Sequence, residues 1–161
     1  MASPDMKRLW APWRTTFLHG PRPRGCIFCR AKRRPANDRK TFVVARGRRA
    51  FALLNVYPYN NGHVMIAPYR HVGALDALHA EEWAELLRLL QRLLPKLKRH
   101  LHPHGVNVGL NLGRAAGAGI PGHLHLHVVP RWVGDVNFMP ILTDAKVISQ
   151  SLTELYRLLT Q

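Results

Sequence analysis

The segment His123–Pro130 reads HLHLHVVP, three histidines that alternate with aliphatic residues. Successive side chains of a β-strand point to opposite faces of a sheet. The pattern therefore predicts a strand with all three imidazoles on one face and the aliphatic side chains in a core. Packing alone does not explain three neighbouring imidazoles, because each buried ring needs a polar partner. Neutral imidazoles act as nucleophiles, proton donors or metal ligands, so this strand is the candidate functional site.

The distribution of apolar residues outside the histidine segment predicts an α+β domain. Four further strands are expected at Thr41–Ala45, Ala50–Leu54, His63–Ala67 and Val106–Asn111. Apolar residues recur at three and four positions over Ala80–Leu101 and again over Asp144–Leu159, which predicts two amphipathic helices. Thr143 is the expected N-cap of the second helix. Only one helix falls between strands, so the pattern favours an antiparallel sheet over parallel βαβ units.

Length and charge limit the class of protein. The 161 residues predict one globular unit, divided into a Pro-rich basic arm (1–40), a core (41–132) and a C-terminal extension with a helix (133–161). No apolar run reaches the roughly 18 residues of a membrane span, and no signal peptide is recognised, so the expected location is the cytoplasm. The net charge is +15. It favours anionic partners, which could be nucleotides, polyphosphates, nucleic acid or an acidic membrane surface, with a solvated basic face as the alternative. Of these we expect a nucleotide substrate and no membrane partner.

Two short motifs carry further chemistry. Cys26 and Cys29 form a C-x-x-C pair, which indicates half of a metal site or a redox pair. The Pro-rich stretch before them disfavours the thioredoxin arrangement. The glycine-rich loop 113–122 directly precedes the histidines. Its backbone N–H groups can approach a phosphate closely, and Arg114 can add positive charge.

The histidine segment resembles the motif of the histidine triad superfamily of nucleotide hydrolases and transferases. The resemblance extends upstream to FALLN at 51–55 and GHV at 62–64, and covers roughly Thr41–Trp132. LWAPWR at 9–14, the cysteine pair and PRW at 130–132 resemble the bacterial branch similar to diadenosine tetraphosphate phosphorylases and hydrolases. The resemblance implies a five-stranded antiparallel sheet with two helices, and a homodimer paired through the long helix and the strand beside it.

The resemblance also implies a two-step displacement on a dinucleoside polyphosphate. His125 matches the histidine that attacks the α-phosphorus to form a nucleotidyl-histidine intermediate. His127 matches the residue that assists at the scissile phosphate, and His63 matches a fourth histidine behind the triad. No metal is required for this chemical step.

Four other residues match substrate-binding positions of the superfamily. Asn55 matches a position near the ribose, and Asn111 one that holds phosphate oxygens. Backbone amides around Gly119 are expected to stabilise developing charge, with Arg114 nearby. The loop departs from the phosphorylase-like pattern, because no serine or threonine occurs from Asn111 to Pro130. Hydrolysis, phosphorolysis and cleavage of an adenylyl phosphoramidate all stay open, as does a basic nucleotide- or nucleic-acid-binding protein without turnover.

Zinc-carrying members of the superfamily combine the C-x-x-C pair with two histidines. The matching residues in this chain are Cys26, Cys29, His71 and His123. Two thiolates and two imidazoles make a closed tetrahedral site, which is typical of structural rather than catalytic zinc. Such a site would join the Pro-rich arm to the sheet. The alternative is a reduced thiol pair beside an incidental histidine.

Overall fold

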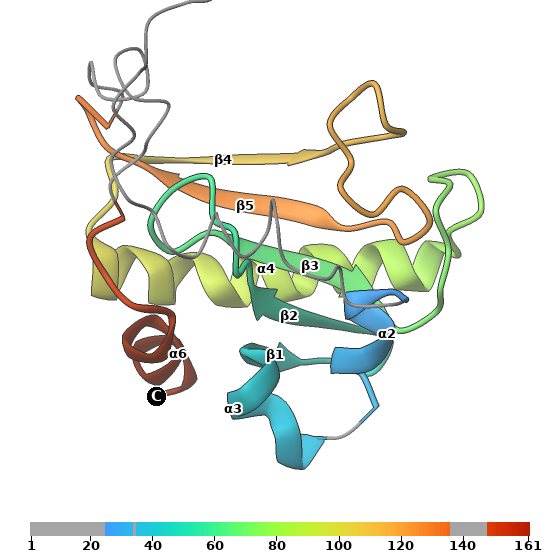
Figure 1. The fold of residues 1–161 in the computed structure, drawn as a ribbon, viewed down its shortest axis with the longest axis horizontal. Helices are drawn as coiled ribbons and strands as arrows, with labels where there is room; N and C mark the ends of the chain where they lie inside the picture. The colour runs from blue at the N-terminus through green and yellow to red at the C-terminus, as the bar shows by residue number, and fades with distance from the viewer. Residues whose placement is uncertain (1–24, 34, 136–147) are drawn as a thin grey trace, which may run out of the picture.

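The computed structural model describes residues 25–33, 35–135 and 148–161. The predicted arm up to residue 24 and the segment 136–147 lie outside the described residues. The centre is a five-stranded sheet of order β1-β2-β3-β5-β4 (Figure 1), in which every neighbouring pair is antiparallel. Its strands are β1 (Val43–Arg46), β2 (Ala50–Leu54), β3 (Val64–Pro68), β4 (Gly105–Leu110) and β5 (Leu126–Arg131). The predicted five-stranded antiparallel sheet is confirmed.

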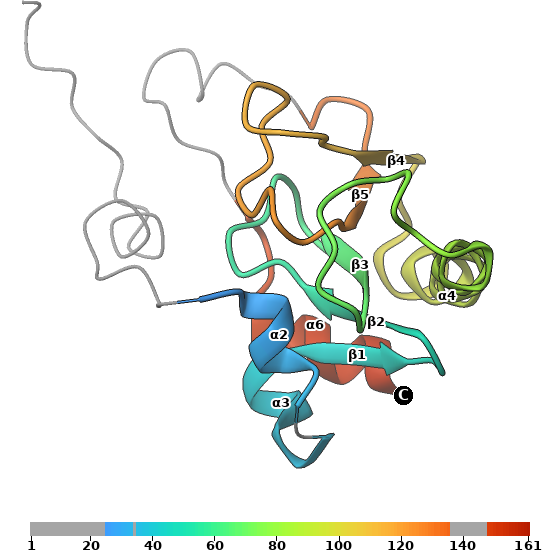
Figure 2. The ribbon, with the colours of Figure 1, turned by 90° about the vertical axis from the view of Figure 1, so that its right-hand side faces the viewer.

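One face of the sheet packs against the long helix α4 (Ala80–Leu101), whose predicted bounds are confirmed. Leu86, Leu89, Leu93 and Leu97 of α4 are almost fully buried against the inward-facing side chains of the strands. Figure 2 shows α4 along this face of the sheet and the short helix α2 on the opposite side. No helix in the described ranges combines the length and apolarity needed to cross a bilayer.

The C-terminal helix α6 (Leu152–Thr160) adds to the same core through Leu155 and Leu159. The predicted start at Asp144 was too early, because the described residues 148–151 are not helical. Ser151 caps the helix instead, its hydroxyl accepting a hydrogen bond from the backbone N–H of Glu154 at 3.2 Å. An N-cap residue has non-helical backbone angles, so the helix begins after it. Thr143 lies outside the described residues.

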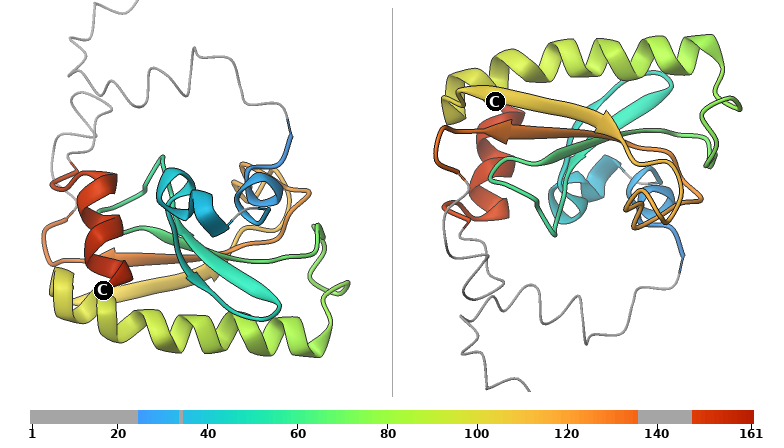
Figure 3. Two further views of the ribbon diagram at one scale, coloured as in Figure 1. Left: turned by 90° about the horizontal axis from the view of Figure 1, so that it is seen from below. Right: turned by 90° about the horizontal axis from the view of Figure 1, so that it is seen from above.

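The opposite face of the sheet is covered near one end by α2 (Ile27–Ala31) and α3 (Asp38–Thr41), with the 3-10 turn η1 (Pro35–Asn37) between them. Figure 3 shows these elements packed together beside the sheet. Helix α2 and most of α3 lie within the segment 1–40, for which the sequence predicted only a Pro-rich basic arm. Phe28 of α2 is completely buried in a second apolar cluster with Phe51 and Met65. This burial is the driving force for the first described residues to fold against the sheet.

The histidine segment straddles the start of β5. The strand begins at Leu126, three residues after the predicted start, and pairs with β4 on one side and β3 on the other. The alternation of side chains nevertheless starts before the strand. His123, His125 and His127 are buried on the α2 side, whereas Leu126 and Val128 join the core beneath α4. The predicted separation of imidazoles from aliphatic side chains is what the structure shows.

Candidate active site and cysteine cluster

His125 has one ring nitrogen occupied by the backbone. Its Nδ1 lies 2.8 Å from the carbonyl oxygen of His123. A carbonyl only accepts hydrogen bonds, so this contact assigns the proton of a neutral ring to Nδ1. The other nitrogen, Nε2, then carries a lone pair. A neutral imidazole in this tautomer is a competent nucleophile without an additional base.

His63 and His127 form a hydrogen-bonded pair beside His125. Two donors point at Nδ1 of His63, the backbone N–H of Tyr59 at 3.0 Å and the side-chain amide of Asn55 at 3.2 Å. The orientation of that amide is fixed because its oxygen accepts the N–H of Tyr57 at 2.9 Å. Nδ1 of His63 is therefore an acceptor and Nε2 carries the proton. Nε2–H of His63 donates a hydrogen bond to Nδ1 of His127 over 2.9 Å.

His127 consequently presents a donor. With Nδ1 accepting from His63, its own proton lies on Nε2. Nε2 is buried and has no hydrogen-bonding partner among the described residues. A buried donor without a partner is costly, and such atoms mark places where a ligand completes the site. The ring of His127 lies 4.7 Å from that of His125, centroid to centroid. The His125 ring, with a lone pair on Nε2, therefore lies next to the His127 ring, with an unpaired N–H on Nε2.

Burial keeps these rings neutral. It lowers the pKa of His63 to about 3, with repulsion from His127 as a smaller cause. Burial likewise lowers the pKa of His127 to about 4. Burial lowers the pKa of His125, and the hydrogen bond to the backbone of His123 partly opposes this effect. At neutral pH the histidine cluster, His63, His125 and His127, therefore holds no charge.

Two aromatic residues that sequence reasoning missed hold these rings. Tyr59 stacks on His127 with centroids 5.4 Å apart and planes at 23°. Phe28 contacts the rings of both His123 and His125, at 4.9 and 4.8 Å. Tyr59 lies in the loop between β2 and β3, and Phe28 lies between the two cysteines. Neither position shows periodicity, so the only available signal was an aromatic residue within a motif.

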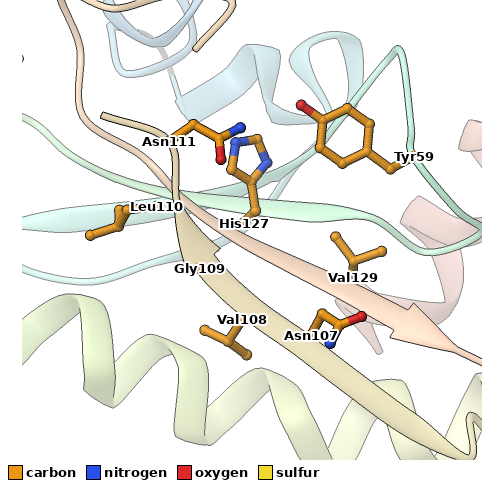
Figure 4. Close-up of a pocket in the computed structure, with 8 residues that line it drawn as sticks. All are labelled: Tyr59, Asn107, Val108, Gly109, Leu110, Asn111, His127 and Val129. Carbon is orange, nitrogen blue, oxygen red and sulfur yellow. The ribbon is translucent and has the colours of Figure 1, made fainter. Parts of the chain in front are cut away.

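The predicted substrate-binding residues lie in three different surroundings: a groove beside His127, a hydrogen bond with His63, and the exposed loop between β4 and β5. Asn111 lines an open groove together with His127, Tyr59, Asn107, Gly109 and Val129. Figure 4 shows the Asn111 amide and the Tyr59 ring on either side of the His127 ring. Asn55 is engaged with His63 and the Tyr57 backbone, as described above. Gly119 and Arg114 are exposed in the loop between β4 and β5.

The second group of interest is the cysteine cluster, Cys26, Cys29, His71 and His123. Sγ of Cys26 lies 3.2 Å from Nδ1 of His123, and Sγ of Cys29 lies 3.3 Å from Nδ1 of His71. All four candidate ligand atoms lie within 4.8 Å of one another. A tetrahedral ion with bonds of about 2.0–2.3 Å separates its ligands by roughly 3.3–3.8 Å. The donor set and its spacing therefore fit a metal ion.

The orientation of His123 supports this fit. Its Nε2 lies 2.9 Å from the carbonyl oxygen of Pro68, so that nitrogen carries the proton. Nδ1 is left with a lone pair that points to the thiols. Metal-ligating histidines characteristically donate their other ring N–H to a carbonyl or carboxylate. Burial lowers the pKa of His123 to about 4 and raises that of the Cys26 thiol.

Basic residues far outnumber acidic ones in the stretch from Arg22 to Arg49, which contributes to the net charge that suggested anionic partners, and part of this stretch has a structural role. Arg46 forms a bidentate ion pair with Asp38, at 2.9 and 2.6 Å, and donates to the carbonyl of Ala31 at 3.0 Å. The ammonium of Lys32 donates to the carbonyl of Tyr69. These contacts join α2 and α3 to the sheet. Other basic side chains of the stretch, Arg30 and Arg49 among them, are exposed.

Comparisons with known proteins agree with this geometry. A profile of the HIT domain matches residues 36–133. The chain is 44% identical over 162 residues to a Mycobacterium tuberculosis protein named AP-4-A phosphorylase, covering 96% of this chain and 83% of the relative. It is 33% identical over 82 residues to a bis(5'-adenosyl)-triphosphatase of Dictyostelium discoideum, covering 51% and 54% of the two chains.

Among solved structures, a Zn-bound histidine triad family protein from Mycobacterium smegmatis superimposes with a TM-score of 0.64 at 27% identity. The match covers 84% of this chain and 91% of that protein. The profile match spans more than half of the chain, and it includes every member of the histidine cluster. This chain belongs to the HIT (histidine triad) domain family.

Proposed function

We propose that this chain is an enzyme that cleaves dinucleoside polyphosphates at an α-phosphate, through a nucleotidyl intermediate on His125. The observation that carries the proposal is that His125 and His127, which lie side by side, have opposite tautomers. Nε2 of His125 has a lone pair, and the neighbouring Nε2 of His127 has a proton without a partner. The names of the M. tuberculosis and D. discoideum relatives support this substrate class.

The first step forms a bond from Nε2 of His125 to the α-phosphorus and breaks the bond to the bridging oxygen. The electron pair of the broken bond leaves with the departing phosphate, a stable anion that needs no proton. The imidazole of His125 becomes positively charged, and the carbonyl of His123 at Nδ1 stabilises it. Nε2–H of His127 donates a hydrogen bond to a phosphate oxygen. Asn111 is placed to add a second donor beside it.

The second step returns His125 to the neutral form. An incoming oxygen nucleophile bonds to phosphorus and the bond from phosphorus to Nε2 breaks. Water forms a nucleoside monophosphate and loses a proton to the solvent, whereas inorganic phosphate forms a nucleoside diphosphate. The name of the M. tuberculosis relative favours phosphate as the acceptor. In this chain, backbone donors of the loop after Asn111 or Arg114 would orient it, since the loop holds no hydroxyl side chain.

The cysteine cluster has a separate role in this proposal. Cys26, Cys29, His71 and His123 would hold a structural zinc ion, as four closed ligands of this type do. The Zn-bound relative from M. smegmatis supports the choice of metal. The ion would anchor α2, and with it Phe28, against the histidine cluster.

The proposed assembly is a cytoplasmic homodimer. Strand β4 lies at an edge of the sheet, and Val108 at its centre is 45% exposed. An unpaired edge is a site for pairing with another strand, here the β4 of a second copy. Two reduced cysteines suit the reducing cytoplasm.

The proposed function is tested by product analysis with diadenosine tetraphosphate, with and without inorganic phosphate. AMP plus ATP irrespective of phosphate would identify a hydrolase. ADP plus ATP formed only with phosphate would identify a phosphorylase. If no nucleotide is released under either condition while the protein is folded, the substrate assignment is wrong. An adenylyl phosphoramidate and an oligonucleotide would then be the next ligands to test.

A further inference from the structure

The groove beside His127 runs along the two strands at the sheet edge. Gly109 of β4 lies directly opposite His127 of β5, and Asn107 lies opposite Val129. These four positions, with Tyr59 and Asn111, line the groove, whereas His125 does not. In Figure 4 the groove residues extend from the His127 ring along β4 and β5 to Asn107. The groove thus leads away from the nucleophile.

The order of side chains along β5 matches the order of atoms in a displacement at phosphorus. Alternate residues of a strand share a face and are spaced by about 6.6 Å. His125, His127 and Val129 therefore follow one another on the face that bears the imidazoles. A nucleophile and a leaving oxygen are roughly in line across phosphorus. With attack from His125 and the donor of His127 at the phosphate, the leaving group departs over Val129.

We propose that this groove binds the leaving half of the substrate, a nucleoside polyphosphate, and that Asn107 is a specificity-determining residue for it. This inference rests on the function proposed above and deepens it. The buried, unpartnered Nε2 of His127 marks the inner end of the groove as a ligand site. The chemistry of the other lining residues suits a charged ligand that also carries a planar base.

Asn107 supplies polar recognition at the outer end. Its side-chain oxygen accepts a hydrogen bond from Nη1 of Arg131 at 2.8 Å, which orients the amide and leaves its N–H₂ as a donor. Arg131 is in turn fixed by a bidentate ion pair with Asp135, at 2.6 and 2.8 Å. A preorganised amide donor beside a guanidinium suits phosphate oxygens. The two strands therefore present donors at both ends of the groove.

Tyr59 and Gly109 supply room and an aromatic surface. The side chain of Tyr59 stacks on His127 yet the residue is 50% exposed, so part of its ring is available for stacking on a base or a ribose. A Cβ at Gly109 would meet no atom within 4 Å. Strand β4 therefore carries no side chain opposite His127, which leaves space for the bridging phosphates of the substrate.

The test compares two substrates with the same adenylyl half, diadenosine tetraphosphate and adenosine 5'-phosphoramidate, whose leaving group is only ammonia. Asn107→Ala should lower kcat/KM for the tetraphosphate about fivefold relative to that for the phosphoramidate, the loss of one hydrogen bond. Gly109→Leu, whose Cβ would meet no atom within 4 Å and whose side chain would occupy the groove, should lower that ratio at least about tenfold. Asn37→Ala and Gly105→Leu are the matched controls, the same changes outside the groove, and should leave the ratio unaltered.

A binding measurement without turnover completes the test. In a His125→Ala background, adding Gly109→Leu should weaken the Kd for diadenosine tetraphosphate about tenfold and leave that for AMP unchanged. Equal losses for both ligands, or no loss for either, would overturn the groove assignment even if wild-type turnover is normal. Absence of wild-type cleavage of both substrates would instead refute the proposed function itself, and the groove assignment with it.

Discussion

The histidine cluster and the cysteine cluster use the same side chain for opposite purposes within five residues of chain. His123 donates a hydrogen bond from Nε2–H to the carbonyl of Pro68 and turns the lone pair of Nδ1 toward the thiols. His125 donates from Nδ1–H to the carbonyl of His123, whereas Nδ1 of His127 accepts a hydrogen bond from Nε2–H of His63. In the proposed mechanism the free nitrogen would serve as a metal ligand in His123, as a nucleophile in His125 and as a hydrogen-bond donor in His127. The hydrogen-bonding partner, rather than the residue type, assigns the role.

The two clusters are also joined. The backbone carbonyl of His123 orients His125, while the side chain of the same residue belongs to the cysteine cluster. Phe28, within the C-x-x-C segment, packs on both rings. Substitutions can separate the two functions of His123, because a side chain can be removed while its carbonyl stays.

Removal of the nucleophile should have the largest effect. His125→Ala should lower kcat on diadenosine tetraphosphate by at least about a thousandfold, because no other lone pair replaces Nε2. Bound metal should remain unchanged, since the cysteine cluster keeps all its ligands. Steady-state rates and metal analysis by mass spectrometry measure the two effects. His100→Ala, in the last turn of α4, is the control; comparable rates in both variants would contradict the assignment.

Removal of the donor should come second. His127→Ala should lower kcat by about a hundredfold, the cost typical of losing one donor to a charged transition state. KM should change much less, because the donor acts on charge that develops during the reaction. A larger change in KM than in kcat would show that His127 serves ground-state binding instead. Stopped-assay kinetics over a range of substrate concentrations distinguish these results.

Removal of the candidate metal ligand should have a smaller effect on turnover. His123→Ala keeps the carbonyl that orients His125, so kcat should fall less than about tenfold. Zinc affinity should fall by at least about a hundredfold, because a closed four-ligand site loses one ligand. Competition with a chromogenic chelator and a turnover assay give both values. A loss of turnover as large as that of His125→Ala would mean that the clusters are not separable.

The smallest expected effect is a pH dependence of stability from the histidine cluster. The pKa values of His63 and His127 are lowered to about 3 and about 4 from an ordinary value of 6.5. Below pH 6.5 the unfolded chain therefore binds more protons than the folded one, and the free energy of unfolding falls as the pH decreases toward 4. Above pH 6.5 this contribution is fully present.

Urea unfolding at pH 5.0 and 7.5 with a chelator present measures this contribution. His63→Phe removes one titrating group, so the difference between the two pH values should be smaller in that variant than in the wild type. An equal or larger difference in His63→Phe would contradict the assigned direction of the shift.

Much of this arrangement could be predicted from the sequence, because it depends on local patterns. The alternation at His123–Val129 predicted the two faces of β5, and the period over Ala80–Leu101 predicted α4 with its bounds. The start of α6 was wrong because the periodic pattern continues through 148–151, where Ser151 caps the helix. The helix around Phe28 was missed because five residues are too few to show a period.

The tautomers could not be predicted, because the groups that fix them are distant in sequence or belong to the backbone. Pro68 is 55 residues from His123, and His63 is 64 from His127. The stacking of Tyr59 on His127 likewise requires β3 to pair with β5, and the groove beside Gly109 requires β4 to pair with β5. The residues of the site could be named from a motif, but their protonation states required the fold.

The most direct test of the assigned roles is long-range ¹H–¹⁵N NMR of the histidine rings in the metal-free protein at pH 7.5. The expected spectrum shows His125 protonated at Nδ1, and His63, His123 and His127 protonated at Nε2. A His125 ring protonated at Nε2 would have no lone pair at the site, and a His127 ring protonated at Nδ1 would have no donor there. Either result would contradict the proposed mechanism.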